Sequence, residues 1–120
     1  MPHLTALNVY PVFERSIRAR EKTLTIKLGD KRADYEIGDE LDLTCGWDAM
    51  TAQKLARIRV TEVKNMSLWR VDKKSLEGDV IRVEDVQSMC IFLSLIYHYD
   101  VTPSTWVTLI RWEYIEKEEC

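Results

Sequence analysis

Basic side chains gather in the first quarter of the chain, where they could hold an anion. The 120-residue chain has a formal net charge of −3, which argues against the broad basic surface that DNA-binding proteins usually present. Residues 1–32 nevertheless carry seven Lys and Arg against three acids, a local excess of +4. A small anionic ligand could bind there, although such positions are more often simply solvated. The seven are Arg15, Arg18, Arg20, Lys22, Lys27, Lys31 and Arg32.

Residue types that bind metals or form disulfides lack the spacing that either role needs. Cys45, Cys90 and Cys120 are odd in number and far apart, so we expect free thiols. His3 and His98 stand alone, without the neighbouring ligands of a zinc site. We therefore predict no metal and no other cofactor.

Tryptophan could contribute by stacking on a nucleic-acid base. Trp47 is expected in the loop after a strand, where its ring either stacks on a base, with a gain of ~1–3 kcal/mol, or fills the core. Trp69, Trp106 and Trp112 are expected to pack inside, the last two because they lie in an apolar closing segment.

The composition predicts one soluble globular domain. Hydrophobic residues make up 46% and charged residues 31% of the chain, which suffices for a core at this length. The longest apolar stretch, residues 89–97, is far shorter than the ~20 residues that cross a bilayer, and no secretory signal is visible. We expect a cytoplasmic monomer with a single domain over residues 1–120, flexible at residues 1–7 and 116–120.

Hydrophobic periodicity in the first half of the chain indicates a helix and then strands. Val12, Phe13 and Ile17 fall at helical spacing within residues 12–20, which predicts a short amphipathic helix. A period of two is typical of half-buried strands. It occurs in three segments, residues 23–28, 41–45 and 56–60.

The second half of the chain indicates a longer helix and a closing strand. The helix is expected near residues 84–98, with a buried stripe formed by Val86, Cys90, Leu93 and Tyr97. Residues 106–112 are rich in β-branched and aromatic side chains, as strands are. This order predicts an α+β fold, a small, mostly antiparallel β-barrel of about five or six strands with one short and one longer helix.

Three motifs in a fixed order resemble the signature of ASCH domains. Residues 20–27 read Arg-Glu-Lys-Thr-Leu-Thr-Ile-Lys, similar to the family's Lys-Thr-x-Thr stretch after a short helix. A Gly-Asp turn at residues 38–39 enters a strand, and Leu-Glu-Gly at residues 76–78 precedes the long helix. The likeness spans roughly residues 8–115. It implies a PUA-like β-barrel, related to domains that bind RNA, with a cleft suited to a nucleobase or nucleotide.

One branch of this family consists of bacterial N(4)-acetylcytidine amidohydrolases, which hydrolyse the acetyl amide on cytidine. The resemblance to that branch implies a catalytic set of Lys22, Thr25 and Glu77. Candidate substrate-binding residues are Arg20, Lys27 and Trp47. Where the family has arginine this chain has Lys27, which lacks the planar fork of a guanidinium. A variable loop precedes Glu77, so Asp79 or Glu84 could take its role.

The implied chemistry is attack by an activated threonine hydroxyl. Thr25 needs a base, which is Lys22 if burial favours the neutral amine; otherwise Glu77 is the base and Lys22 stabilises the oxyanion. Residues 22 and 25 of a regular strand point to opposite faces, so the site needs a bend there. Without one, Lys22 is a solvated strand-end residue and Thr25 lies on the wet face.

Three functions follow from the resemblance. The leading one is a hydrolase acting on a modified nucleoside or RNA, by amide hydrolysis of the N(4)-acetylcytidine type. The alternatives are a non-catalytic RNA-binding module that uses the same cleft, and an RNA-cleaving nuclease. Convergence of the three candidate catalytic residues on a small deep pocket would favour the enzyme.

Overall fold

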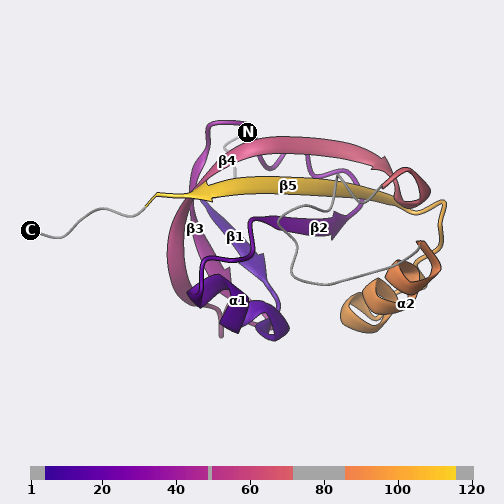
Figure 1. The fold of residues 1–120 in the computed structure, drawn as a ribbon, viewed down its shortest axis with the longest axis horizontal. Helices are drawn as coiled ribbons and strands as arrows, with labels where there is room; N and C mark the ends of the chain where they lie inside the picture. Colours follow the sequence, from indigo (N-terminus) through magenta and orange to yellow (C-terminus); the bar gives the residue numbers. More distant parts are fainter. Residues whose placement is uncertain (1–4, 49, 72–85, 116–120) are drawn as a thin grey trace, which may run out of the picture.

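The computed structural model describes residues 5–48, 50–71 and 86–115 (Figure 1). Five strands, two α-helices and two 3-10 helices make up this part of the chain. In chain order they are β1 (Ala6–Val9), η1 (Pro11–Phe13), α1 (Glu14–Arg18), β2 (Leu24–Leu28), β3 (Glu40–Cys45), β4 (Gln53–Ser67), η2 (Leu68–Arg70), α2 (Val86–Tyr97) and β5 (Trp106–Tyr114). None of the helices described is long and apolar enough to cross a membrane.

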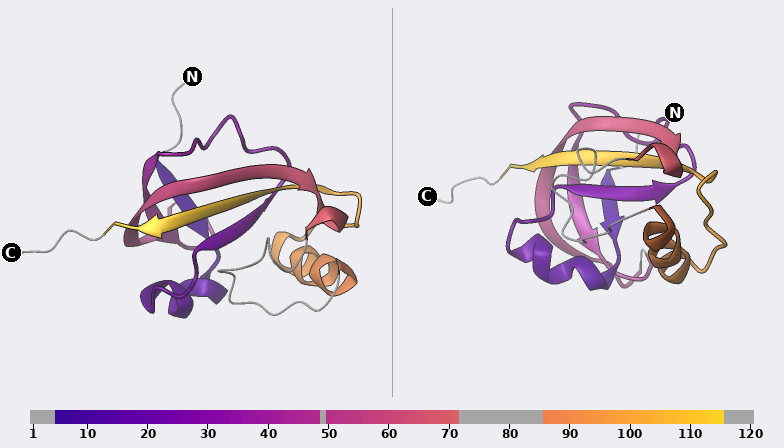
Figure 2. Two further views of the ribbon diagram at one scale, coloured as in Figure 1. Left: turned by 45° about the horizontal axis from the view of Figure 1, so that its top comes forward. Right: turned by 45° about the vertical axis from the view of Figure 1, so that its right-hand side comes forward.

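The strands form one curled sheet in the order β1-β3-β4-β5-β2. β1 pairs with β3 in parallel, and the other three pairings are antiparallel. The long β4 and β5 arch over the other strands, and α1 and α2 lie apart on the open side (Figures 1 and 2). The α+β class is therefore confirmed.

The expected closed barrel is replaced by an open sheet, because β1 and β2 remain its two edges. β1 has only four residues, and Pro11 follows closely, with no N–H to extend a ladder. A side chain links the two edges instead: Nζ of Lys27 on β2 donates to the backbone oxygen of Asn8 on β1, at 2.7 Å.

Buried residues form two clusters on opposite sides of β5. The first fills the hollow and includes Phe13 and Ile17 together with Ile110 and Trp112 of β5. The second lies between the outer side of β2 and β5 and α2, and includes Leu24, Ile26, Val107, Leu109, Cys90 and Leu93. Both faces of β2 are therefore covered, which corrects the expectation that it is half-buried with a wet face.

Several predicted elements differ in extent. The helix expected at residues 12–20 is split into η1 and α1, and Val12 is exposed rather than buried. β4 extends well beyond residues 56–60. The predicted strand ended too early because a register shift between Val60 and Glu62 interrupts the period of two. β1 was not predicted. The strands at residues 23–28, 41–45 and 106–112 and the helix near residues 84–98 are confirmed.

The tryptophans divide between the core and the surface. Trp112 is buried in the hollow, as expected. Trp69 and Trp106 are exposed instead. Trp106 begins β5 opposite Ser67, the last residue of β4, so it lies at the far end of the long pair. Trp69 lies in η2, which directly follows β4.

Candidate functional site

A sharp turn between α1 and β2 sets the position of Lys22. Arg20 has a φ of 60°, a left-handed conformation that is uncommon for residues other than glycine. The next two amide groups, of Glu21 and Lys22, both donate to the backbone oxygen of Ser16, at 2.9 and 3.3 Å. Lys22 therefore precedes the regular pleat of β2 and is not bound by its alternation, which provides the bend that the site needs.

The side chain of Lys22 lies inside the protein. It is 1% exposed, and its Nζ lies 4.1 Å from the centroid of the Phe13 ring. Phe13 belongs to the cluster in the hollow. The hydroxyl of Tyr114 donates to the backbone oxygen of Lys22 and fixes the main chain there. Lys22 is thus not a solvated strand-end residue.

Thr25 faces the same hollow. It is 6% exposed and lies directly opposite Ile110 of β5. Directly opposed residues of antiparallel strands share a face, and Ile110 belongs to the cluster in the hollow, as Phe13 does. The structure therefore brings Lys22 and Thr25 to one side of the sheet. Glu77, like Asp79 and Glu84, lies outside the described residues.

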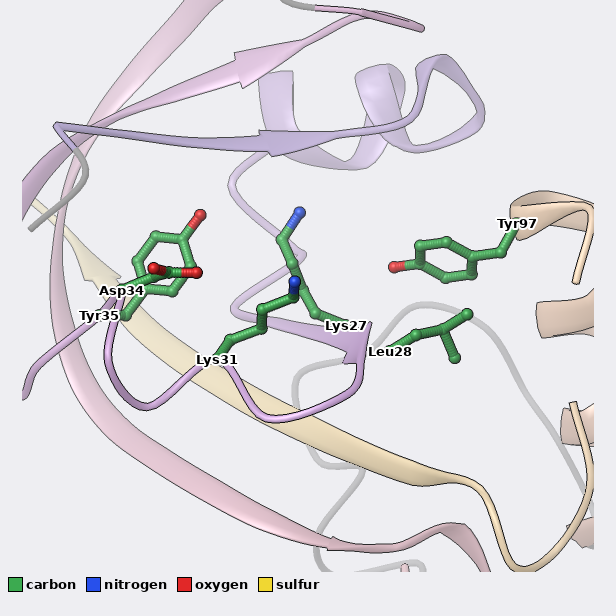
Figure 3. A pocket seen from close by; sticks show the side chains of 6 residues that line it. All are labelled: Lys27, Leu28, Lys31, Asp34, Tyr35 and Tyr97. Carbon is green, nitrogen blue, oxygen red and sulfur yellow. The ribbon is translucent and has the colours of Figure 1, made fainter.

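A cavity opens two residues further along β2. Its volume is about 340 Å³, within the range of small-molecule sites. The ammonium groups of Lys27 and Lys31 project into the same space, between the rings of Tyr35 and Tyr97 (Figure 3). Leu28 and Asp34 complete the lining within the described residues. Lys27 and Thr25 are two positions apart in the strand, so both side chains lie on its inner face.

Burial shifts the pKa values of three groups that line this cavity. Desolvation, and after it the nearby charge of Lys31, lower the pKa of Lys27 from 10.5 to about 8. Desolvation also raises the pKa of Tyr35 to about 12 and that of Tyr97 well above its ordinary value. Both phenols therefore stay neutral at physiological pH. The hydroxyl of Tyr97 donates to the backbone oxygen of Ile26 at 2.7 Å.

A row of aromatic rings leads from this cavity to the surface. The rings of Tyr97 and Tyr10 meet edge to face, with centroids 5.4 Å apart. The ring of Tyr10 lies 5.3 Å from that of Trp47, which is 65% exposed. The structure thus connects two predicted substrate-binding residues, Lys27 and Trp47, through two tyrosines that sequence reasoning did not assign to the site. Tyr10 offered no periodic signal, and Tyr97 was interpreted as part of a buried stripe.

Arg20, the third predicted substrate-binding residue, has a different setting. Its guanidinium donates to the backbone oxygen of Ile17 at 2.9 Å and lies 5.0 Å from the centroid of the Tyr114 ring. It is not among the residues that line the Lys27 cavity. The bond to Ile17 therefore stabilises the turn between α1 and β2.

The basic cluster of residues 1–32 is also divided. Arg18 and Arg32 form exposed ion pairs with Glu14 and Asp30, at 3.3 and 2.6 Å. Such surface pairs neutralise each other and contribute little to stability. Of the described residues, Lys27, Lys31 and Asp34 bring charged side chains to the cavity.

Comparisons with known proteins find this fold in solved structures. The sequence matches no protein-family model and no curated protein. The structure resembles that of an ASCH domain from Lactobacillus crispatus JV V101, with a TM-score of 0.60 and 15% identity over 86% of this chain and 70% of that one. The chain has the fold of an ASCH domain.

Two further solved structures share this ASCH-like fold. One is the hypothetical protein PH0355, with a TM-score of 0.61 and 16% identity over 90% of this chain and 95% of that one. The other is protein EF3133 from Enterococcus faecalis V583, of family-model DUF984, with a TM-score of 0.63 and 16% identity over 87% of this chain and 67% of that one. At these identities the likeness establishes the fold and leaves function to the residues of the site.

Proposed function

We propose that this ASCH-fold protein is a hydrolase that cleaves the amide of an acylated cytidine, of the N(4)-acetylcytidine type. The main support is the burial of Lys22 and Thr25 on the inner side of the curled sheet. A strand with a solvated inner face would bury neither side chain. Charged side chains are rarely buried, and a lysine that shares a buried face with a threonine is a candidate for chemistry.

The proposed reaction has two steps. The Thr25 hydroxyl attacks the acyl carbonyl carbon and gives its proton to a base, and the cytidine amine leaves with a proton, so that an acyl ester remains on threonine. Water then hydrolyses the ester and restores the hydroxyl. The resemblance to the amidohydrolases leaves Lys22 and Glu77 as alternatives for the base, and we assign that role to Glu77. Lys22 stabilises the developing oxyanion, since the face of Phe13 beside its Nζ favours the charged ammonium.

Non-catalytic RNA binding is a second candidate, favoured by one observation. Trp47 is exposed beside the aromatic row that leads to the two lysines, an arrangement that suits stacked bases and phosphates. An RNA groove would contact several phosphates, so its affinity would fall steeply with salt. Affinity that stays constant between low and high salt would rule out this candidate and leave the hydrolase intact.

The direct test is deacylation of N(4)-acetylcytidine, as nucleoside and as 5′-monophosphate, by the purified protein. Thr25→Val keeps the shape of the side chain and deletes only the hydroxyl, and we expect turnover to fall ~10³-fold or more. Thr25→Ser retains a hydroxyl and is expected to keep part of the activity. Thr61→Val, at an exposed position of β4, is the matched control.

Two results would refute the hydrolase. One is the absence of deacylation of either substrate by the wild-type protein. The other is wild-type turnover by Thr25→Val, which would exclude threonine as the nucleophile. Strand cleavage of RNA, followed in parallel, would point to the nuclease instead.

A further inference from the structure

Two lysines and one carboxylate, that of Asp34, lie among the described residues that line the cavity beside β2. Lys27 and Lys31 both line it, close enough for the charge of Lys31 to lower the pKa of Lys27. In the described part of the chain neither lysine forms an ion pair, although Asp34 also lines the cavity. Like charges in a partly enclosed space repel each other, and a bound anion would reverse that repulsion.

The loop that carries Lys31 is held in place by partly buried hydrogen bonds. The backbone N–H of Lys31 donates to the hydroxyl of Thr108, at 2.9 Å, and this hydroxyl donates to the backbone oxygen of Gly29, at 2.7 Å. Asn65 of β4 donates to the same hydroxyl and the same oxygen. Gly29 has a φ of 82°, which suits glycine alone among common residues. The two ammonium groups are thus presented by a fixed backbone, as an anion site requires.

The rest of the cavity suits a nucleotide better than a bare anion. Tyr97 forms one wall and continues through Tyr10 toward Trp47, so flat apolar surface adjoins the cations. Lys27 lies two residues beyond Thr25 on the same face of β2, a distance of ~7 Å along a strand. One nucleotide can span that distance, with its base toward Thr25 and its phosphate at the lysines.

We propose that Lys27 and Lys31 bind the phosphate of a nucleoside monophosphate, so that the protein takes a nucleotide in preference to the uncharged nucleoside. Lysine acts here as a point charge for phosphate oxygens. The placement of the base at Thr25 rests on the proposed function, whereas the phosphate site rests on the cavity alone.

The test compares the binding of cytidine 5′-monophosphate, cytidine and inorganic phosphate to the full chain by calorimetry at low salt. We expect the monophosphate to bind at least ~10-fold more tightly than cytidine, and inorganic phosphate to compete with it. Lys31→Met is expected to remove most of that preference. Lys54→Met, which removes an exposed lysine paired with Asp42 on the outer face, is expected to bind as the wild type does. Lys27→Met is the second variant, should Lys31→Met disturb the fold.

Equal affinity for the monophosphate and the nucleoside would overturn the inference, as would equal binding by Lys31→Met and Lys54→Met. Binding of an RNA chain without binding of the mononucleotide would overturn it too. The results that would overturn the phosphate site differ from those that would refute the proposed hydrolase reaction. Lysine-dependent nucleotide binding without deacylation would keep the phosphate site and refute the reaction. Equal deacylation of nucleoside and nucleotide, with equal affinity, would keep the reaction and refute the site.

Discussion

At the residue scale, the sequence identified side-chain types but not their surroundings. The motif marked Lys22, Thr25 and Lys27, yet a period of two placed Thr25 on a wet face, and the structure buries it. The reason is that a second layer, α2, covers the apolar face of β2, while the polar face turns into the hollow. Periodicity reports which residues share a face and is silent on what covers that face.

Lys27 and Lys31 are expected to be electrostatically coupled. Replacing Lys31 by Met should raise the pKa of Lys27 from about 8, but only part of the way to its ordinary value, since desolvation is the larger cause of the shift. NMR titration of the Lys27 side chain in both proteins measures this. Lys54→Met should leave the pKa unchanged, and an unchanged value in Lys31→Met would show that the two charges do not interact.

The depressed pKa of Lys27 also predicts how stability depends on pH. Between about pH 8 and pH 10.5 the folded protein has lost the proton of Lys27 and the unfolded chain retains it, so the free energy of unfolding rises with pH. Relative to Lys27→Met, the wild type should gain stability over this window, by on the order of 3 kcal/mol at most.

Denaturant unfolding at several pH values measures this difference. Of the groups that line the cavity with Lys27, Tyr35 and Tyr97 have raised pKa values. Asp34 and Lys31 are the other ionisable side chains there within the described residues. A difference between wild type and Lys27→Met that does not change from pH 8 to pH 10.5 would contradict the prediction.

At the element scale, strand and helix types were predictable and their ends were not. β2, β3, β5 and α2 follow from periodicity and composition. The register shift at residues 60–62 interrupts the pattern of β4, so the pattern indicates a shorter strand than the structure has. β1 is too short to show a period of its own. The cavity could not be predicted, because its residues come from β2, the following loop and α2, and only the packing of these elements brings them together.

The hydrogen bonds of Thr108 are expected to stabilise the loop that carries Lys31. Thr108 is fully buried, so Thr108→Val would remove the acceptor of the Lys31 N–H and one side-chain donor to the Gly29 oxygen, which keeps its bond from Asn65. We expect a loss of ~1–3 kcal/mol in the free energy of unfolding. Thr61→Val, at an exposed position, should change it by less than ~0.5 kcal/mol. Urea unfolding of both variants is the measurement, and equal stabilities would mean that these bonds contribute little.

At the scale of the whole molecule, the order of motifs carried more information than any single motif. The Lys-Thr-x-Thr stretch and the Gly-Asp turn, in sequence with predicted strands and helix, indicated an ASCH-like fold, and solved structures share that fold at only 15–16% identity. The predicted closure of the sheet was wrong, because closure requires backbone pairing between β1 and β2, which the residue pattern within either strand does not report.

The central claim is that Lys22 and Thr25 act as one catalytic unit, and a double-mutant cycle on deacylation tests it most directly. Lys22 is 1% exposed, so Lys22→Ala would leave a cavity and destabilise the fold; Lys22→Met fills the space, and thermal unfolding of each variant checks folding. We expect Lys22→Met and Thr25→Val each to remove most of the turnover of N(4)-acetylcytidine 5′-monophosphate, and the double variant to be little worse than the weaker single variant. Additive losses, or wild-type turnover by a folded Lys22→Met, would contradict the claim.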